Sequence, residues 1–135
     1  MDHAALQGWL DHYSRAWESY DPADVAALFA EDATYRYHPA DEGDDVLRGR
    51  DAIVQAWVAP TGSQSALDPA GTYEGRYRPY AIEGRRAVAV GTSTYWTDPT
   101  RTTVDRVYDN VFLLEFDDAG LCTSFTELYL KRAEP

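Results

Sequence analysis

The sequence has little cysteine, little histidine and no long apolar run. Its only cysteine, Cys122, cannot form a disulfide within the chain, and a lone cysteine is typical of a reducing compartment. Three scattered histidines and one cysteine give no spacing that suits a metal. No stretch approaches the roughly 18 apolar residues that a membrane-spanning helix needs. The first residues are acidic and amphipathic, unlike a secretory signal. We therefore expect a cytoplasmic protein that neither crosses a membrane nor holds a metal.

Positive charge is also scarce. Lys and Arg total 12 against 23 Asp and Glu, so the formal net charge is −11. Such a chain repels nucleic acid and anionic membranes. The glycine motifs G-x-x-x-x-G-K-[ST] and G-x-G-x-x-G, which bind nucleotide phosphates, are both missing from the sequence. We therefore expect no nucleic-acid partner, no membrane partner and no cofactor.

The apolar pattern of the first 60 residues predicts helices. Between Leu6 and Tyr20 apolar residues recur every three or four positions, which indicates an amphipathic helix. Asp21 and Pro22 suit the N-cap and first position of a second, short helix, which we expect to end near Phe29. Residues 34–38 have the composition of a strand. A third helix is expected over residues 49–60, stopped by the proline at its end.

The sequence pattern of the rest of the chain predicts strands. They are expected at residues 72–80, 86–97, 102–116 and 121–131, joined by turns short enough for antiparallel neighbours. Helices that are largely separated in sequence from an antiparallel sheet indicate the α+β class. A length of 135 residues suits one domain, so we predict a single domain over residues 1–135.

Three stretches carry a family resemblance: ALFAEDATYRYHP (27–39), GRDAIVQAW (49–57) and VFLLEFDDAGLCTSFTELYL (111–130). In this order and spacing the chain resembles the nuclear transport factor 2-like superfamily, in its SnoaL-like branch. The resemblance implies a cone-shaped α+β barrel with three helices packed on a strongly curved antiparallel sheet that encloses a pocket, usually in a homodimer. The superfamily includes steroid isomerases and polyketide cyclases, so the fold alone does not determine the function.

The resemblance offers His38 as a catalytic base. It stands just before a proline, where ketosteroid isomerases of this superfamily carry an aspartate, and a neutral imidazole can act as a base near pH 7. The strand that leads to it is one residue longer than theirs. A shift of one residue would turn Tyr37 into the pocket and His38 away from it, and the sequence leaves both possibilities open.

A second catalytic candidate is Glu127, which matches the acidic residue on the last strand of SnoaL-like cyclases. By two-residue alternation it shares a face with Phe125 and Tyr129. If that face is buried, the pKa of the carboxyl would rise, which suits a general acid. The alternative is a glutamate on an open or dimer-facing side of the sheet, paired with an arginine.

The strand 102–116 has one face that is richer in aromatic residues, which we turn toward the pocket. This face carries Arg106, Tyr108, Asn110, Phe112, Leu114 and Phe116. Phe112 matches the place where the isomerases hold a protonated aspartate in the oxyanion hole, so that donor is missing. Asn110 could supply an amide donor instead, or it could be an ordinary buried amide with its hydrogen bonds satisfied.

Further residues have both a ligand-binding and a structural interpretation. Tyr13 lines up with the oxyanion-hole tyrosine of the isomerases, although tyrosines on an apolar stripe are more often core residues. Trp17 and Trp57 are candidates for the pocket wall or for the core. Arg106 could bind an anionic group or pair with a carboxylate. The complete set expected to contact substrate is Trp17, Tyr37, Trp57, Arg106, Tyr108, Phe112, Phe125 and Tyr129.

These residues together predict an enzyme that uses general acid–base chemistry without a cofactor. His38 and Glu127 would exchange protons with the substrate, and Tyr13 and Asn110 would stabilise negative charge. The expected reactions are isomerisation, cyclisation or dehydration of an apolar, oxygenated ring-type substrate. The alternatives are a non-catalytic pocket that binds a small hydrophobic molecule, and a module that only dimerises. The other face of strand 102–116 carries Val107, Val111 and Leu113 among acidic residues, which would favour a homodimer through the sheet.

Overall fold

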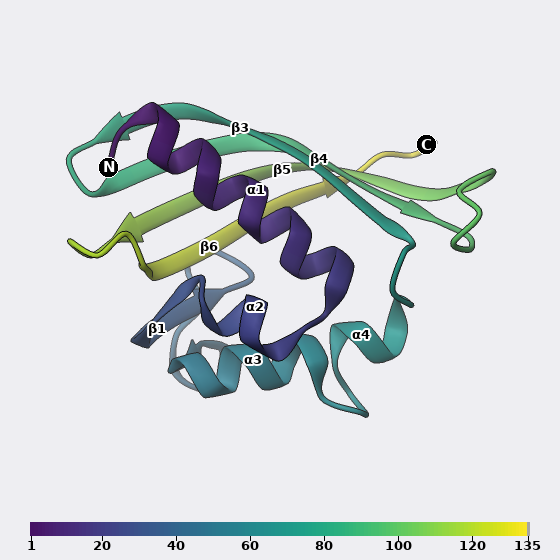
Figure 1. Cartoon of the computed structure of the whole chain (residues 1–135), viewed down its shortest axis with the longest axis horizontal. Coiled ribbons are helices and arrows are strands. Elements are labelled where there is room, and N and C mark those ends of the chain that lie inside the picture. The colour runs from purple at the N-terminus through teal and green to yellow at the C-terminus, as the bar shows by residue number, and fades with distance from the viewer. Residues whose placement is uncertain (135) are drawn as a thin grey trace.

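A computed structural model describes residues 1–134, and in it helices pack on one face of a curved six-stranded sheet (Figure 1). The helices are α1 (His3–Ser19), α2 (Pro22–Ala26), α3 (Arg50–Val58) and α4 (Gln64–Leu67), with a 3-10 turn at Gly43–Asp45. The strands are β1 (Phe29–Arg36), β2 (Leu47–Arg48), β3 (Tyr73–Glu83), β4 (Arg86–Trp96), β5 (Val104–Phe116) and β6 (Cys122–Lys131). No helix within residues 1–134 is long and apolar enough to cross a membrane.

The first two helices begin at side-chain caps. The carboxylate of Asp2 accepts a hydrogen bond from the backbone N–H of Ala5 at 2.8 Å, and Asp21 accepts one from Ala23 at 2.9 Å. Pro22 occupies the first turn of α2, where its missing N–H leaves no hydrogen bond unmade. These contacts confirm the predicted start of the second helix.

The sheet has the order β2-β1-β6-β5-β4-β3. Strands β3, β4, β5 and β6 form the predicted antiparallel meander, and the bounds of β5 and β6 lie within two residues of those expected. Strand β3 lies at an open edge and has an irregular register between Pro79 and Ala81. The fold class predicted from the sequence is therefore confirmed.

Strand β1 differs from the prediction in position and direction. It begins at Phe29, which we had placed at the end of the second helix, and the regular strand ends at Arg36, before His38. It joins the central part of the sheet by pairing with β6 in parallel, so the sheet is mixed rather than wholly antiparallel. The register between the two strands shifts between Phe29 and Thr34. Strand β2 and helix α4 were not predicted, because two and four residues are too few to show a period.

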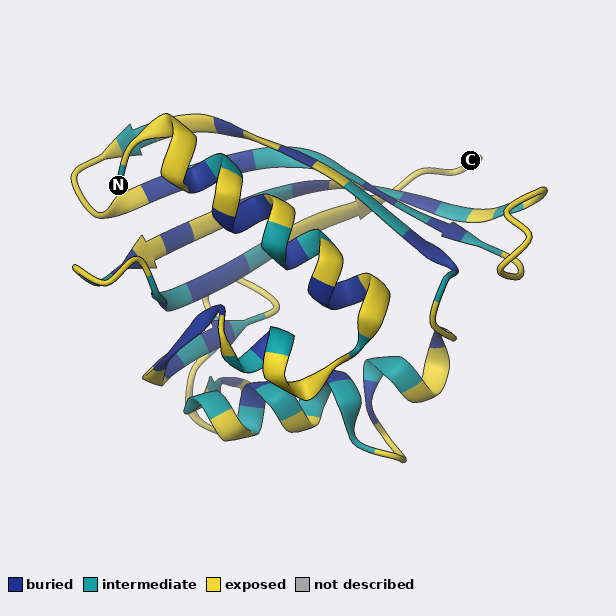
Figure 2. Cartoon of the chain, viewed as in Figure 1, coloured by how far each residue is buried: buried dark blue, intermediate teal, exposed yellow. Residues whose placement is uncertain are grey.

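The core lies between the helices and the inner face of the sheet. Figure 2 shows α1 with its buried positions toward the sheet and its exposed positions away from it. Tyr13 of α1 stacks on Phe125 of β6, with ring centroids 5.5 Å apart, and also packs on Phe112 of β5. Burying a large apolar side chain of this kind contributes about 1.5–3 kcal/mol. The inner face of the sheet is thus held against α1 mainly by aromatic rings.

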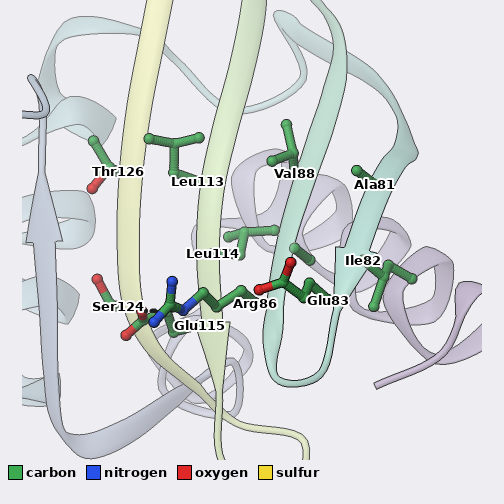
Figure 3. A pocket seen from close by; sticks show the side chains of 11 residues that line it. Ala81, Ile82, Glu83, Arg86, Val88, Leu113, Leu114, Glu115, Ser124 and Thr126 are labelled. Carbon is green, nitrogen blue, oxygen red and sulfur yellow. Dashed lines mark ion pairs between the residues drawn. The ribbon is translucent and has the colours of Figure 1, made fainter.

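The outer face of the sheet carries a shallow hollow of about 530 Å³ (Figure 3). Val88, Leu113 and Thr126 are neighbours across β4, β5 and β6 in one row. In the next row the guanidinium of Arg86 lies 3.6 Å from the carboxylate of Glu115. This face therefore combines apolar side chains with an exposed ion pair.

Gly91 and Gly8 differ in the space around them, and substitution at Gly91 tests how closely β3 and β4 approach each other. A Cβ atom on Gly91 of β4 would lie 2.1 Å from the carbonyl oxygen of Arg76 and 2.5 Å from the Tyr77 ring. Gly8, on the exposed side of α1, has nothing within 4 Å of such an atom. The same added methyl group should therefore have opposite effects at the two positions.

We expect Gly91→Ala to destabilise the protein by about 1–3 kcal/mol, because the backbone of β3 must move. Gly8→Ala should stabilise it by up to about 1 kcal/mol, since alanine favours a helix over glycine. Urea unfolding followed by circular dichroism measures both changes. A Gly91→Ala variant as stable as the parent chain would show that β3 does not approach β4 this closely.

Candidate functional site

A small polar cavity of about 160 Å³ opens on the inner face of the sheet. Strands β4, β5 and β6 supply most of its wall, and α1 and α4 supply the rest. Its lining residues are Trp17, Gln64, Ser93, Tyr95, Arg106, Tyr108, Asn110, Glu127 and Tyr129. The cavity therefore gathers an acid, an amide and several hydroxyl groups from segments that are distant in sequence.

Glu127 is the ionisable group whose properties are most altered in this cavity. It lies on the inner face of β6 between Phe125 and Tyr129, as alternation along the strand predicts. Burial raises its pKa from 4.5 to about 7, because an ionised carboxylate loses its hydration there. Hydrogen bonding from Asn110, and less so from Tyr35, partly opposes that rise. Glu127 can therefore exist in both protonation states near neutral pH.

Asn110 is the direct partner of Glu127. Its side chain is 4% exposed, and its Nδ2 donates to Oε1 of Glu127 at 3.1 Å. Its Oδ1 accepts from the Ser93 hydroxyl at 2.7 Å. The second N–H of the amide has no acceptor within hydrogen-bonding distance among residues 1–134. Asn110 thus holds Glu127 and keeps one donor free at the cavity wall.

Arg106 lies at the other end of the cavity, and its charge is already paired. Its guanidinium donates to both carboxylate oxygens of Asp68, at 2.7 and 2.8 Å, and to Asp105 at 2.7 Å. It also lies over the Tyr95 ring at 4.0 Å. Asp68, which follows α4, is therefore tied to β5, and Gln64 of α4 is held beside the cavity by a hydrogen bond to Asp68. Of the two interpretations given to Arg106, the carboxylate pair is the one seen.

The end of β1 turns Tyr37 and His38 to different surroundings. The Tyr37 ring contacts Tyr35, and burial raises its pKa, with a further contribution from the nearby Glu127. The His38 side chain is 70% exposed, and its Nδ1 lies 3.3 Å from Asp41. His38 does not line the polar cavity. Tyr37 is 40% exposed and, like His38, does not line the polar cavity, so the structure brings neither of them into it.

A second hollow, of about 450 Å³, lies where β1 ends beside β5 and β6. Its lining includes Tyr37, His38 and Pro39, which follow β1, and Asn110, Glu127 and Tyr129 of β5 and β6. Val111, Leu128 and Leu130 make it more apolar than the polar cavity. Both His38 and Glu127 appear among the residues that line this hollow.

The remaining predicted residues divide between cavity and core. Trp17, Tyr108 and Tyr129 line the polar cavity, as expected of substrate-binding residues. Four others are almost wholly buried in the aromatic core and do not line the cavity: Tyr13, Trp57, Phe112 and Phe125. Burial raises the pKa of Tyr13 well above its ordinary value, so its hydroxyl stays protonated.

Several cavity residues were not predicted. Ser93, Gln64 and Tyr95 line the cavity and Asp68 pairs with Arg106 beside it, but none of these four was expected from the sequence. Ser93 and Tyr95 share their strand face with Ala87 and Ala89, which are buried, so the alternation in β4 could have placed them inside. No sequence pattern indicates Asp68, because it lies just after α4 and its partner Arg106 is 38 positions further along the chain.

No cluster of three or more His, Cys, Asp or Glu side chains that could hold a metal ion occurs within residues 1–134. Cys122 is fully buried, and burial raises the pKa of its thiol. The polar cavity itself offers a carboxyl of altered pKa at Glu127 and hydrogen-bonding groups beside it.

The altered pKa of Glu127 predicts a dependence of stability on pH. The folded state holds the proton more tightly than the unfolded state, whose carboxyl has a pKa near 4.5. The stabilisation is complete below pH 4.5 and is lost as the pH rises through about 7. A neutral Glu127→Gln variant should match the parent chain at pH 4 and exceed its stability by about 2–3 kcal/mol at pH 8.5.

Urea unfolding at the two pH values measures this difference. The exposed Glu83→Gln is the matched control, and its stability relative to the parent should change little between pH 4 and 8.5. If Glu127→Gln and Glu83→Gln change the stability equally at pH 8.5, the ionised Glu127 carboxylate does not destabilise the folded state.

Comparisons with known proteins agree with this architecture. No curated protein matches the chain. An NTF2-like protein with a cystatin-like fold from Novosphingobium aromaticivorans has 19% identity and a TM-score of 0.66, covering 93% of this chain and 80% of that one. A candidate polyketide cyclase from Sinorhizobium meliloti has 18% identity and a TM-score of 0.62, covering 95% and 100% of the two chains.

A candidate ketosteroid isomerase from Kribbella flavida has 21% identity and a TM-score of 0.61, covering 99% of this chain and 84% of that one. At such low identities these similarities establish the fold alone. The family model of the SnoaL-like domain matches residues 10–125, which is most of the sequence. The chain therefore belongs to the SnoaL-like domain family.

Proposed function

We propose that this protein is a cofactor-independent enzyme in which Glu127 acts as the general acid and base. The observation that carries the proposal is the partly buried carboxyl of Glu127, which is hydrogen-bonded to Asn110 in a polar cavity and whose pKa is raised to about 7 by the loss of hydration there. A catalytic acid or base works best when its pKa lies near the working pH. An altered pKa of a carboxyl in a cavity is itself a common sign of an active site.

The arrangement suits a proton taken from one atom of the substrate and returned to another. Ionised Glu127 would accept a proton from a carbon beside a carbonyl group, and the neutral carboxyl would then give it to another carbon or to a departing hydroxyl group. Negative charge would develop on the substrate oxygen, and the free N–H of Asn110 is a donor that can meet it. Tyr108 and Tyr129, in the cavity wall, are further hydroxyl donors. Isomerisation, cyclisation and dehydration all consist of such steps.

The size and polarity of the cavity limit which part of a substrate can enter. Its volume of about 160 Å³ is smaller than the roughly 300–1,000 Å³ of most small-molecule sites. We propose that the oxygenated end of the substrate enters it and that an apolar ring remains at the mouth. Trp17 and Tyr129 are the wall residues suited to contact such a ring.

In this scheme Glu127 does not need His38. His38 is exposed and hydrogen-bonded to Asp41, so its proton exchanges with water rather than with the polar cavity. A role for His38 would require a substrate that also occupies the hollow beside β1, where both residues appear. A non-catalytic protein that binds a small hydrophobic molecule is the alternative, but the polar wall of the inner cavity favours the enzyme.

Turnover provides the test of the enzyme. The chain would be incubated in D2O with a set of cyclic and open-chain β,γ-unsaturated ketones and β-hydroxy ketones, and exchange, isomerisation and dehydration would be followed by proton NMR. We expect Glu127→Gln to lower kcat by roughly 100-fold or more on any substrate that reacts, because an acid–base group is lost. His38→Gln should change kcat by less than about threefold, since a solvated side chain supplies no such group.

Binding measured in parallel separates the two functions. For an enzyme, Glu127→Gln should leave the Kd of a substrate analogue nearly unchanged, because shape and apolar contact supply most of the affinity. The non-catalytic alternative would be favoured by a ligand that binds tightly and is never converted. The affinity for such a ligand should fall only when Trp17 is truncated. A larger loss of kcat with His38→Gln than with Glu127→Gln would contradict the assigned role of Glu127.

We also propose that the outer face of the sheet forms a homodimer and that the protein works in the cytoplasm. No helix of residues 1–134 covers the hollow around Val88 and Leu113 (Figure 3). Leu113 is 39% exposed and Leu128, two strand positions beyond Thr126, is 36% exposed. A two-fold copy would cover this apolar strip and could pair the exposed Arg86 and Glu115 across the interface. The single, buried Cys122 suits a reducing compartment.

Light scattering at micromolar concentration should give about twice the chain mass of 15.2 kDa. Leu113→Arg should give the monomer mass, because two like charges would then be buried at the centre of the interface. Glu31→Arg, on the exposed part of β1, is the matched control and should remain dimeric. A monomer mass for the parent chain would refute the dimer.

A further inference from the structure

A line of hydrogen bonds runs across four strands of the inner face and ends at Glu127. The Tyr73 and Tyr77 hydroxyls are 2.5 Å apart, and the Tyr77 hydroxyl is 2.6 Å from that of Ser93. Ser93 contacts Oδ1 of Asn110 at 2.7 Å, and Nδ2 of Asn110 contacts Glu127 at 3.1 Å. The five residues come from β3, β3, β4, β5 and β6 in turn, so each strand adds at least one link.

The groups in this line have a fixed donor direction. Because Nδ2 of Asn110 donates to Glu127, its Oδ1 must accept from Ser93. Ser93 has one hydroxyl hydrogen, so it accepts from Tyr77, and Tyr77 for the same reason accepts from Tyr73. Every donor in the line therefore points toward Glu127.

The opposite direction would leave a hydroxyl without a partner. If the amide of Asn110 were turned over, Ser93 would donate to Tyr77, and Tyr77 to Tyr73. Tyr73 is 2% exposed, and within residues 1–134 its hydroxyl has no other partner. Its hydrogen would then be buried without an acceptor, which costs about 1–3 kcal/mol. The closed end of the line at Tyr73 thus selects one orientation of an amide on another strand.

The backbone makes room for the two tyrosines. A Cβ atom at Gly75 would lie 2.2 Å from the Tyr73 hydroxyl oxygen and 2.6 Å from the Tyr77 ring. At Gly91 it would lie 2.5 Å from the Tyr77 ring. Glycine at these two positions therefore lets the rings lie over the strands, where their hydroxyls reach Ser93.

We propose that Ser93 is a positioning residue, which with Tyr77 and Tyr73 behind it fixes the amide of Asn110 so that its NH2 group faces Glu127 and the reacting atoms. Neutral hydrogen bonds in series polarise one another, so the line also strengthens the donor that Asn110 presents. The catalytic role of this amide orientation rests on the proposed function. The orientation itself can be measured without a substrate.

The other titratable groups that sense the charge of Glu127 are tyrosines of α1, β1, β3 and β4. They are Tyr13, Tyr35, Tyr37, Tyr73, Tyr77 and Tyr95, and burial raises the pKa of each. Across the cavity the charged groups are the paired Arg106 and Asp68. His38 lines the hollow beside β1 together with Asn110 and Glu127, so a titration near neutral pH that the Asn110 amide senses is assigned to Glu127 if it persists in a His38→Gln variant.

The sequence permits an unusually direct test, because Asn110 is its only asparagine. Labelling with ¹⁵N-asparagine gives a single pair of side-chain NH2 signals, which can be followed from pH 4 to 9. In the parent chain the proton bonded to Glu127 should lie downfield and move with a midpoint near pH 7. In Ser93→Ala the amide can turn over, so the two proton shifts should approach each other and the midpoint should rise by about half a pH unit or more.

Tyr77→Phe should shift the signals in the same direction by a smaller amount, and it serves as the second variant if Ser93→Ala does not fold. Thr94→Val is the matched control, since it removes a hydroxyl from the other face of the same strand. Its signals should match the parent's. On a reacting substrate Ser93→Ala should lower kcat severalfold with little change in KM.

A purely structural role for the line would give a different result. Ser93→Ala and Tyr77→Phe would then lower stability but leave the NH2 chemical shifts unchanged and the titration midpoint within about 0.2 pH units of the parent's. That result would refute the proposal. If instead the NH2 signals change as expected while no substrate is converted by the parent chain, the positioning role stands and the enzyme assignment fails.

Discussion

Removal of water from the Glu127 carboxyl is the constraint on which the site depends. The curved sheet brings β1, β5 and β6 around this group, and rings close the space behind it. Tyr35 stacks on Phe125 with centroids 4.6 Å apart, and Phe112 lies 4.9 Å from Phe125. A carboxylate at this position loses hydration that Asn110 only partly replaces. The same aromatic packing that stabilises the fold therefore sets the proton affinity of its acid.

The sequence predicted those parts of the structure that follow from a strict period. Two-residue alternation put Asn110, Phe112 and Glu127 on the inner face, because β5 and β6 are long and their register is regular over most of their length. The apolar stripe of α1 predicted its buried side for the same reason. Long elements with one buried face thus gave the fold class and the position of Glu127.

The end of β1 could not be predicted in this way. Its pairing with β6 is parallel and shifts register between Phe29 and Thr34, so counting by twos along the chain does not carry through to Tyr37 and His38. The line from Tyr73 to Ser93 was missed for another reason. Each of its residues has an ordinary place in a strand, and only the pairing of β3 with β4 brings the Tyr77 and Ser93 hydroxyls into contact. Asp68 was missed for a similar reason, because the residue that it pairs with, Arg106, is 38 positions away in the sequence.

Strand β3 forms an open edge of eleven residues, and such edges invite pairing with further copies into aggregates. Here the exposed Arg76 and Arg78 alternate along it, and Pro79 lacks the N–H that a neighbouring strand would need. Gln7 of α1 already occupies the carbonyl of Tyr77 with a hydrogen bond of 3.1 Å. These features disfavour growth of the sheet past β3, although the strand is long and its edge is open.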